Sequence, residues 1–390
     1  MFNLLRFVRV CNFGCYPKYL GFPQHANSII RSFCESANNV CDQQRSQTLS
    51  FLINSCKLSP VAATVVSEKL ILKSLRNAES VLTILKTYGF SDVQITRLVT
   101  KYSKLLSSHP DKTVLPKLRF FDSIGMPHHV LTGMISRCPT LLGSSLDKCI
   151  IPFYDYLKNI LQSDKKVVRA FSTIGPHSLT TTLNHRASAN VDILRKYGVS
   201  DSNIKFLLEY HSNVLTRKID WVVKAVERAI ELGMDTSKFS FILAVHTLSC
   251  LSKSAWKRKE ELYRRCGWSD PDILTAFSLH PYCMLVSEDK IMRTMEFLVK
   301  EMDCQPKDIA KTPRVLLYCL DKRVAPRCRV IKLLMEKGLL ERSYKLSSLI
   351  SYSEHCFLER FVRKHGHVPE LLEVYRGVRA QSIGNRMKNL

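Results

Sequence analysis

The chain has 390 residues, of which 58 are Lys or Arg and 34 are Asp or Glu, so its formal net charge is +24. A surface this basic favours polyanionic partners, with nucleic acid ahead of an anionic membrane. No apolar run reaches the roughly 18 residues that cross a membrane. No Walker loop, H-E-x-x-H sequence or dinucleotide-binding glycine pattern is present. We therefore expect no catalytic residues, no metal and no cofactor.

The N-terminus is basic and lacks acidic residues. The first 34 residues contain four Lys or Arg and no Asp or Glu. Apolar residues surround the arginines, and this composition is typical of an organelle presequence that is not part of the fold. Serine is scarce and threonine is absent there, which favours the mitochondrion, with the chloroplast as the alternative. We expect a transit peptide over residues 1–33 and a linker over residues 34–49.

A unit of about 35 residues recurs seven times between residues 77 and 320. A fixed position near the end of each unit shows the spacing. It falls at Ser103, Pro139, Pro176, Ser212, Thr247, Pro281 and Pro313. Successive positions are 32 to 37 residues apart. A period in this range is typical of a solenoid, in which each unit buries its apolar face by stacking on its neighbours.

Each unit contains a stretch in which apolar residues recur at i, i+3, i+4 and i+7, the spacing of one helix face. In the first complete unit these positions are Ile95, Leu98, Val99 and Tyr102. Later units repeat them as Leu131, Met134, Ile135, Cys138; Ile204, Leu207, Leu208, His211; Phe239, Ile242, Leu243, His246; and Ile273, Ala276, Phe277, His280. We expect the three histidines to close an apolar stripe and not to bind a ligand.

A shorter helix is expected before each of these stretches. It ends at a glycine, such as Gly89, Gly125 or Gly198, because glycine adopts the left-handed conformation that terminates a helix. Ser-Asp follows two residues later in three units, as at 91–92, where serine can cap the next helix and aspartate favours its positive end. The recurring prolines then end the second helix. The predicted unit is a helix, a glycine turn, a longer helix and a proline stop.

Some units depart from this pattern. Gln162 replaces the turn glycine of the third unit. In the seventh unit Ile309 lies four residues before Pro313, so its second helix is expected to be one turn shorter. Residues 50–72 and 326–363 are interpreted as degenerate leading and trailing units, which a solenoid needs at its exposed ends.

The sequence predicts an all-α fold: an α-solenoid superhelix of about eight repeats over residues 50–365, followed by a polar tail over 366–390. The chain also resembles the mitochondrial transcription termination factor (mTERF) family, in its plant organellar branch. Residues 311–340 carry this resemblance most clearly, with 251–285 before them and 357–362 after them.

The resemblance implies a left-handed superhelix of mTERF-type units, each with two α-helices and a short 3₁₀ piece, around a basic concave groove. It also implies binding to double-stranded DNA or structured RNA in mitochondria or plastids. Members of the family act in transcription termination, transcription initiation or intron splicing.

Two basic clusters are the candidate nucleic-acid-binding sites. Residues 311–332 carry seven basic residues and one acidic residue, whereas the basic cluster at 257–265 is diluted by two glutamates. Lys and Arg neutralise phosphates, and Arg can bond two phosphate oxygens at once. The expected contacts are Arg314, Lys322, Arg323, Arg327 and Arg329 in the first cluster and Lys257, Arg258 and Lys259 in the second.

The expected function is a double-stranded DNA-binding regulator of organellar gene expression that acts in transcription termination and is not an enzyme. One alternative is an RNA-binding intron-splicing factor, since RNA offers the same phosphates. Most aromatic residues fall in apolar stripes, which favours duplex over single strands. The other alternative is a protein-binding α-solenoid scaffold. Expected partners are organellar DNA or structured RNA and organellar transcription or splicing proteins, bound by a monomer without a transmembrane segment.

Overall fold

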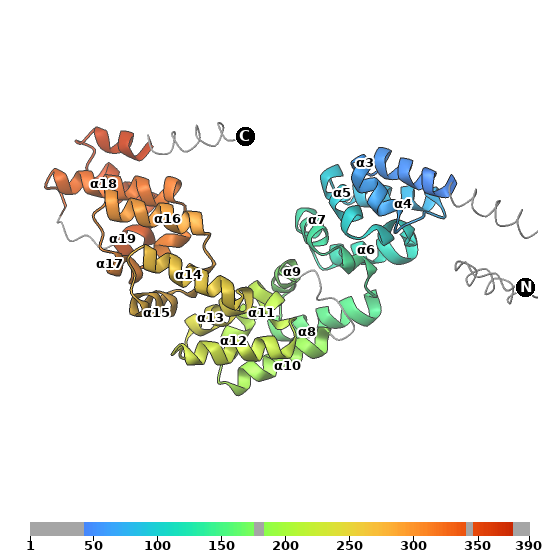
Figure 1. The fold of residues 1–390 in the computed structure, drawn as a ribbon, viewed down its shortest axis with the longest axis horizontal. Coiled ribbons are helices and arrows are strands. Elements are labelled where there is room, and N and C mark those ends of the chain that lie inside the picture. The colour runs from blue at the N-terminus through green and yellow to red at the C-terminus, as the bar shows by residue number, and fades with distance from the viewer. Residues whose placement is uncertain (1–42, 175–182, 341–345, 377–390) are drawn as a thin grey trace, which may run out of the picture. The chain divides into compact units, whose positions relative to one another are not determined.

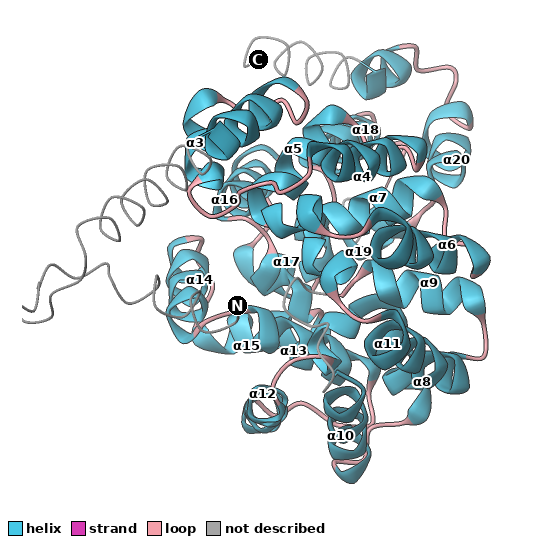
Figure 2. Ribbon diagram, turned by 90° about the vertical axis from the view of Figure 1, so that its right-hand side faces the viewer, coloured by secondary structure: helices cyan, strands magenta, loops and turns pink. Residues whose placement is uncertain are grey.

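The computed structural model describes residues 43–174, 183–340 and 346–376. Every regular element in these ranges is helical (Figure 2), which confirms the all-α prediction. None of the described helices is long and apolar enough to cross a membrane. The expected transit peptide at 1–33 lies outside the described residues, as does Pro176.

The described helices, which Figure 1 shows in chain order by colour, form two compact units. The division falls after Phe120. The first unit contains helical residues 43–54, α3 (Pro60–Ser67), α4 (Leu75–Thr87), α5 (Asp92–Lys101), η1 (Ser103–Ser107) and η2 (Pro110–Val114). The helix α6 (Leu115–Ser123) carries the division.

The second unit consists of the helices that follow α6. Its elements up to the middle of the chain are α7 (His128–Arg137), η3 (Pro139–Gly143), η4 (Leu146–Ile150), α8 (Ile151–Leu161), α9 (Asp164–Ser172), α10 (Leu183–Lys196), α11 (Asp201–Leu215), α12 (Ile219–Glu231) and α13 (Phe239–Cys250). The remaining elements are α14 (Lys253–Arg265), α15 (Asp270–Leu279), η5 (Pro281–Leu285), α16 (Glu288–Glu296), η6 (Phe297–Glu301), α17 (Pro306–Ala310), η7 (Pro313–Leu317), η8 (Leu320–Val324), α18 (Ala325–Glu336), α19 (Leu346–Ser351), α20 (Glu354–Phe357), η9 (Leu358–Arg363) and residues 370–376. Helices α10, α12 and α13 lie side by side (Figure 1).

One residue with positive φ marks the turn of each repeat. In the described residues these positions are Lys57, Gly89, Gly125, Gln162, Gly198, Gly233, Gly267, Asp303 and Gly338. Successive positions are 32 to 37 residues apart, which matches the predicted period. Gln162 takes the left-handed conformation (φ 54°) in place of glycine, as the repeat required. These nine turns correspond to the seven central repeats, the leading repeat and the trailing repeat, with one turn in each.

The relative lengths of the two helices differ from the prediction. Helices α4 and α14 have 13 residues each, whereas the second helices α5 and α15 have 10. In these two repeats the second helix is the shorter one because it ends at a non-helical residue, Tyr102 (φ −145°) or His280 (φ −155°), whereas α11 has 15 residues and α10 has 14. The residue before a proline is disfavoured in the α region, which explains this end at His280. As predicted, α17 in the seventh repeat is shorter still, with 5 residues.

The recurring prolines begin a further element and do not only end the second helix. Pro139, Pro281 and Pro313 each occupy the first position of a 3₁₀ helix, where no backbone N–H is needed. The repeats that end in η1, η3, η5 and η7 therefore have two α-helices and a 3₁₀ piece, as the family resemblance implied, whereas α11 and α13 are followed by no such piece. Serine caps the second helix as predicted: Ser269 Oγ accepts a hydrogen bond from the backbone N of Asp272 at 3.3 Å.

The apolar stripe forms the core between successive second helices. Its members, such as Leu131, Ile204 and Phe277, are buried, and α9, α11, α13 and α15 pack on one another in order. Phe239 is an exception, since 47% of its surface is exposed, and Phe241 is buried in its repeat. Helix α13 begins at Phe239, so this residue lies at the end of the packed face.

The ends of the array extend beyond the predicted boundaries. Residues 43–54 form a helix in which Thr48 is buried and accepts a hydrogen bond from the backbone N of Leu72 at 3.0 Å. Part of the predicted linker therefore belongs to the leading repeat. At the other end Leu371 and Tyr375 of the predicted tail are buried, because they lie at i and i+4 on one face of a helix. Residues 377–390 lie outside the described part.

Candidate nucleic-acid interface

The 3₁₀ helices bring equivalent residues of neighbouring repeats together. Tyr282 is the second residue of η5 and Arg314 is the second residue of η7, and η5 packs against η7. The two side chains therefore occupy adjacent positions in one row. Arg314 is exposed and forms no ion pair within the described ranges. Together with burial, its positive charge lowers the pKa of His280 in the preceding repeat.

Lys322 has the same properties as Arg314. It lies in η8, which follows η7 directly, and its side chain is exposed with no ion pair to a described residue. Two of the five cations predicted in this cluster, Arg314 and Lys322, are therefore available to a ligand.

Arg323 and Arg327 bind the protein's own backbone. Arg323 Nη2 donates to the carbonyl oxygens of Ile350 and Tyr352, both at 2.9 Å, and the guanidinium lies 4.4 Å from the ring centre of Tyr318. Arg327 Nη1 donates to the carbonyl oxygen of Leu349 in α19 at 3.1 Å and to that of Tyr352, just after α19, at 2.8 Å. These arginines attach α19 to the repeat before it.

The structure corrects the expectation for Arg327. Its exposed fraction is 0%, and burial lowers the pKa of its guanidinium. A guanidinium with no exposed surface cannot meet a phosphate. Arg323 is half-buried and already has two backbone acceptors, so it is a poor candidate for the same reason. The sequence could not reveal this, because the carbonyls involved lie 22 to 29 residues further along the chain.

Arg329 is partly exposed but paired. Its Nη2 donates to Glu301 Oε2 at 2.8 Å, and its guanidinium lies 5.5 Å from the ring centre of Phe297. Lys332 of the same helix donates to the carbonyl oxygen of Glu301 at 2.8 Å. A phosphate that binds Arg329 must displace the Glu301 carboxylate. We therefore expect Arg329 to bind phosphate more weakly than an unpaired cation does.

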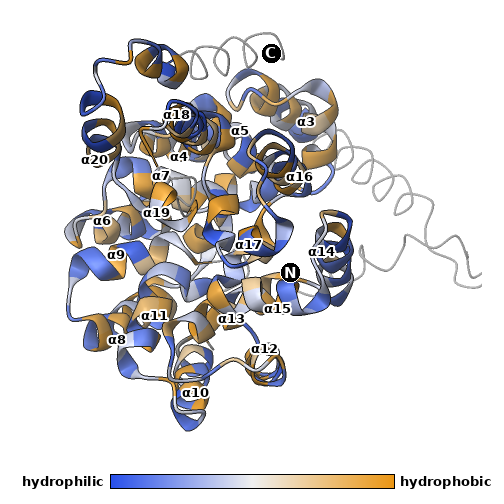
Figure 3. Cartoon of the chain, turned by 90° about the vertical axis from the view of Figure 1, so that its left-hand side faces the viewer, coloured by the Kyte–Doolittle hydropathy of each residue, from blue (hydrophilic) through white to orange (hydrophobic). Residues whose placement is uncertain are grey.

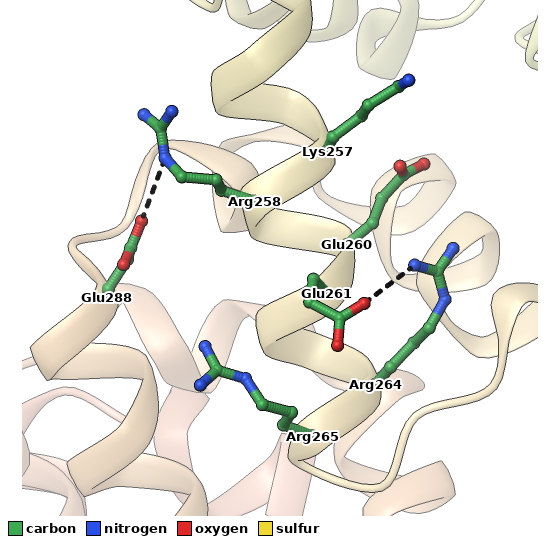
Figure 4. A pocket seen from close by; sticks show the side chains of 7 residues that line it. All are labelled: Lys257, Arg258, Glu260, Glu261, Arg264, Arg265 and Glu288. Atoms are coloured by element: carbon green, nitrogen blue, oxygen red, sulfur yellow. Dashed lines mark ion pairs between the residues drawn. The ribbon is translucent and has the colours of Figure 1, made fainter.

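The second basic cluster lies on α14, which is hydrophilic along much of its length (Figure 3). Figure 4 shows Arg258 turned toward Glu288, with Nε and Oε1 4.0 Å apart, whereas Lys257 points away from that pair. Lys257 is exposed and forms no ion pair with the described residues. Arg264, on the same helix, is bonded to Asp270 at 2.7 Å.

Lys259 is not available to a ligand, which is a second correction. Its exposed fraction is 8%, burial lowers the pKa of its ammonium, and its Nζ donates to the carbonyl oxygen of Val286. Asn190 has the same place in an earlier repeat, eight residues before the turn glycine, and it also bonds carbonyls at the end of its repeat. The side chain at this position therefore stabilises the fold of its own repeat.

One face of α14, together with Glu288 of α16, lines an open depression of about 530 Å³ (Figure 4). Its lining residues are Lys257, Arg258, Glu260, Glu261, Arg264, Arg265 and Glu288. Four of them are cations and three are carboxylates, so the depression is nearly neutral. It is therefore a weaker phosphate site than the row of equivalent residues on the successive 3₁₀ helices η5 and η7, which we call the 3₁₀ row. In that row Arg314 has no carboxylate partner in the described part of the chain.

Comparison with known families decides the classification. The mTERF family model matches residues 82–246 and 229–358, which together cover more than half of the chain. The chain belongs to the mTERF family. This result confirms the resemblance and agrees with the repeat of two α-helices and one 3₁₀ piece.

Two curated proteins of Arabidopsis thaliana are similar to this mTERF chain. One is "Transcription termination factor MTERF8, chloroplastic", 24% identical over 280 residues, which are 70% of this chain and 53% of that protein. The other is "Transcription termination factor MTEF18, mitochondrial", 33% identical over 97 residues, which are 23% of this chain and 17% of that protein. The chain spans about half the length of the first relative and less than a fifth of the second.

Within the mTERF repeats, the sequence analysis missed the recurring pattern to which Lys322 belongs. An Asp-Lys pair recurs at the start of the first helix, at 111–112, 147–148, 289–290 and 321–322. Lys148 is exposed like Lys322, whereas Lys290 donates to the carbonyl oxygen of Leu317 at 2.8 Å. The recurrence of this dipeptide at the repeat period was the signal that could have identified these residues.

A metal centre has no support in the described residues. No group of three or more His, Cys, Asp or Glu side chains there is arranged to hold a metal ion. Cys56, Cys149 and Cys328, which are described and buried, form no disulfide.

Proposed function

We propose that the protein is a nucleic-acid-binding regulator of organellar gene expression that binds double-stranded DNA, acts in transcription termination and has no enzymatic activity. The observation that carries this proposal is membership of the mTERF family together with unpaired cations on the described surface. Both curated relatives are named as transcription termination factors. The formal charge of +24 supports a polyanionic partner.

The proposed phosphate contacts are Arg314 and Lys322, with Lys257 as a further one. Each is exposed and has no carboxylate partner within the described ranges, so binding a phosphate costs no existing ion pair. Arg258 and Arg329 are secondary contacts, because Glu288 and Glu301 compete with phosphate for them.

A specific observation favours RNA as the second candidate ligand. Tyr210 and Phe239 are 40% and 47% exposed, and both rings contact Phe206, at 4.8 and 4.7 Å between centres. Arg169 lies 5.0 Å from the ring centre of Tyr210. Exposed aromatic rings beside a cation can stack on unpaired bases, as single-strand-binding proteins do. This cluster supports the RNA-binding splicing factor as the alternative.

We place the protein in the mitochondrion, with the chloroplast as the alternative. The proposal rests on the acid-free, serine-poor composition of the first 34 residues. One curated relative is named as mitochondrial and the other as chloroplastic.

Crosslinking in intact organelles tests this function. Mitochondria and plastids that contain the tagged protein are irradiated, the protein is purified under denaturing conditions, and the attached nucleic acid is sequenced after DNase or RNase treatment. We expect recovery from mitochondria with DNase-sensitive fragments that cluster at a few loci. RNase-sensitive fragments within introns would replace the DNA proposal with the splicing alternative. Protein partners without crosslinked nucleic acid would favour the scaffold alternative and contradict the proposal.

A further inference from the structure

Three consecutive repeats place a histidine at the same position of the second helix, and the side chains form a cluster. The rings of His211 and His246 lie 3.9 Å apart between centres. Tyr282 of η5 contacts this pair, with ring centres 5.8 Å from His211 and 5.4 Å from His246. The ring of His280 lies 5.8 Å from Tyr282. The sequence analysis assigned these histidines to apolar stripes and did not anticipate their contact with one another.

One hydrogen bond in this cluster joins repeats that are not neighbours. Tyr282 Oη and His211 Nε2 are 2.6 Å apart, although the residues are separated by 71 positions, or two repeat periods. Bonds between neighbouring repeats span about one period, as for Thr96 Oγ1 and the carbonyl oxygen of Cys56, 40 positions apart. Repeats of a solenoid normally contact their immediate neighbours. A bond across two periods therefore restrains the curvature of three repeats at once.

The backbone conformation of His211 accompanies the hydrogen bond between its imidazole and Tyr282. His211 has φ −143° and ψ 39° inside α11, so it interrupts the helix as Tyr102 and His280 do in their repeats. In the repeat between them, α13 continues through His246 without such a break. The imidazole of His246 therefore lies between the two bonded repeats and packs against both rings.

The groups around the cluster favour neutral imidazoles. Arg217 follows α11, His246 and Cys250 come from α13, His280 ends α15, Tyr282 is in η5, and Arg314 is in η7. Burial, then His211 and Arg217, lowers the pKa of His246 to about 3. Burial also lowers the pKa of His211. The Nδ1 atoms of His246 and His280 are buried and have no partner in the described structure. A proton on these rings would place charge beside another ring and beside an arginine.

We infer that the Tyr282–His211 hydrogen bond is a latch between repeats two apart, and that it positions the 3₁₀ row, including Arg314, for nucleic acid. Tyr282 and Arg314 hold the same position in adjacent 3₁₀ helices, so a shift of η5 moves η7 with it. The binding part of this inference rests on the proposed function, whereas the latch itself does not.

Hydrogen exchange of Tyr282→Phe tests the latch in the full chain. The variant keeps the ring and removes the hydroxyl. The matched control is Tyr263→Phe, which removes a 2.7 Å bond from Tyr263 to the carbonyl oxygen of Cys283 within one repeat. We expect Tyr282→Phe to speed exchange about tenfold both in peptide 281–287 and in peptide 207–217, two repeats away. The control should affect only the first peptide. Unchanged exchange in 207–217 for Tyr282→Phe would overturn the latch.

A double substitution separates the hydrogen bond from general packing. His211→Phe removes the acceptor and keeps an aromatic ring. If the bond is the latch, adding Tyr282→Phe to His211→Phe should change exchange of peptide 281–287 by less than twofold, because coupled residues are not additive. Independent tenfold effects of the two substitutions would contradict the inference.

Acidification tests whether the imidazoles of the cluster are neutral and buried. Burial depresses the folded-state pKa values of His211 and His246, so the packed state is fully favoured above the ordinary histidine value of about 6.5, and protonation opposes it below that value. Protection factors in peptide 207–217 of the wild type should therefore fall from pH 7.5 to 5.5. Protection that stays constant over this range would contradict neutral, buried imidazoles in the cluster.

Binding distinguishes this inference from the proposed function. On one duplex at fixed salt, Tyr282→Phe should weaken affinity about three- to tenfold, and Tyr263→Phe less than twofold. If the wild type binds the duplex and both variants bind equally well, the positioning role fails and the proposed function stands. If the wild type does not bind nucleic acid, the proposed function fails, while the exchange experiment still decides the latch.

Discussion

Replacing Arg327 with methionine should destabilise the trailing repeat by about 3 kcal/mol, seen as roughly a hundredfold faster hydrogen exchange in α19. Arg327 is completely buried and donates Nη1 to the carbonyl oxygens of Leu349 and Tyr352. Its guanidinium also lies 4.8 Å from the ring centre of Phe357. Methionine keeps part of the apolar stem but leaves the two carbonyls without this donor.

The desolvation of the buried charge opposes this effect. Removing a guanidinium from an apolar site recovers part of the free energy spent on its burial, which is why the expected loss is 3 kcal/mol and not the sum of two charged hydrogen bonds. Arg329→Met is the matched control on the same helix. Its ion pair with Glu301 is exposed, so the loss there should be about 1 kcal/mol or less. A neutral or stabilising Arg327→Met would show that desolvation exceeds the value of the bonds.

Placing a carboxylate at Phe277 should cost more than about 4 kcal/mol and unfold the repeats around α15. Phe277 has no exposed surface, and its ring packs edge-on against Trp256 at 5.0 Å between centres. Phe277→Asp removes a large buried ring and buries a charge in its place. Urea denaturation, followed by circular dichroism, measures the loss as a lower midpoint.

Phe239 provides the matched control, since it belongs to the same predicted stripe but is 47% exposed. Phe239→Asp should cost about 1 kcal/mol or less, because the new carboxylate stays in water. Pro281→Ala, which changes the first residue of a 3₁₀ helix, should also be tolerated far better than Phe277→Asp. Equal midpoints for the two aspartate variants would contradict the assignment of the core.

The repeat itself could be predicted because it depends on local chemistry. Glycine at a fixed position predicts a left-handed turn, and the structure shows one at Gly89 and at Gly198. The sequence analysis noted Gln162 in place of the turn glycine, and the structure shows that it takes the same left-handed conformation. The helix lengths could not be read in the same way. The stripe shows which face is buried, whereas the end of the second helix depends on the backbone at Tyr102 and its equivalents.

The candidate interface was predicted less well than the fold. Counting charges found Arg314 and Lys322, which are exposed, but counted Arg327 and Lys259 equally. A cation that binds a carbonyl of its own chain has the same sequence signature as one that binds phosphate. Its acceptor is supplied by a segment that only folding brings close, such as α19 for Arg327.

Some cations of this chain bind its own carbonyl oxygens and others remain exposed, and this difference has a physical basis. Helix ends leave carbonyl oxygens without donors, and long cationic side chains from the preceding helix can reach them. Lys290 does this for Leu317, Lys259 for Val286 and Arg323 for Ile350, each 27 positions along the chain. Part of the positive charge of this chain therefore stabilises the repeats, and the remainder is available to a polyanion.

A salt titration of duplex binding tests most directly whether the exposed cations hold phosphates. Each neutralised phosphate contributes about 0.9 to the slope of log affinity against log salt. The triple variant Arg314→Gln, Lys322→Gln, Lys257→Gln should therefore flatten the slope by roughly 2 to 3, equally on a target and on a scrambled duplex.

The control variant Arg195→Gln, Arg264→Gln, Lys300→Gln removes the same charge from side chains that are held in ion pairs within the second unit. We predict a flatter slope for the first variant and a slope close to the wild-type value for the control, with both proteins folded. An unchanged slope in the first variant, or the same flattening in both variants, would contradict a phosphate-binding surface at Arg314, Lys322 and Lys257.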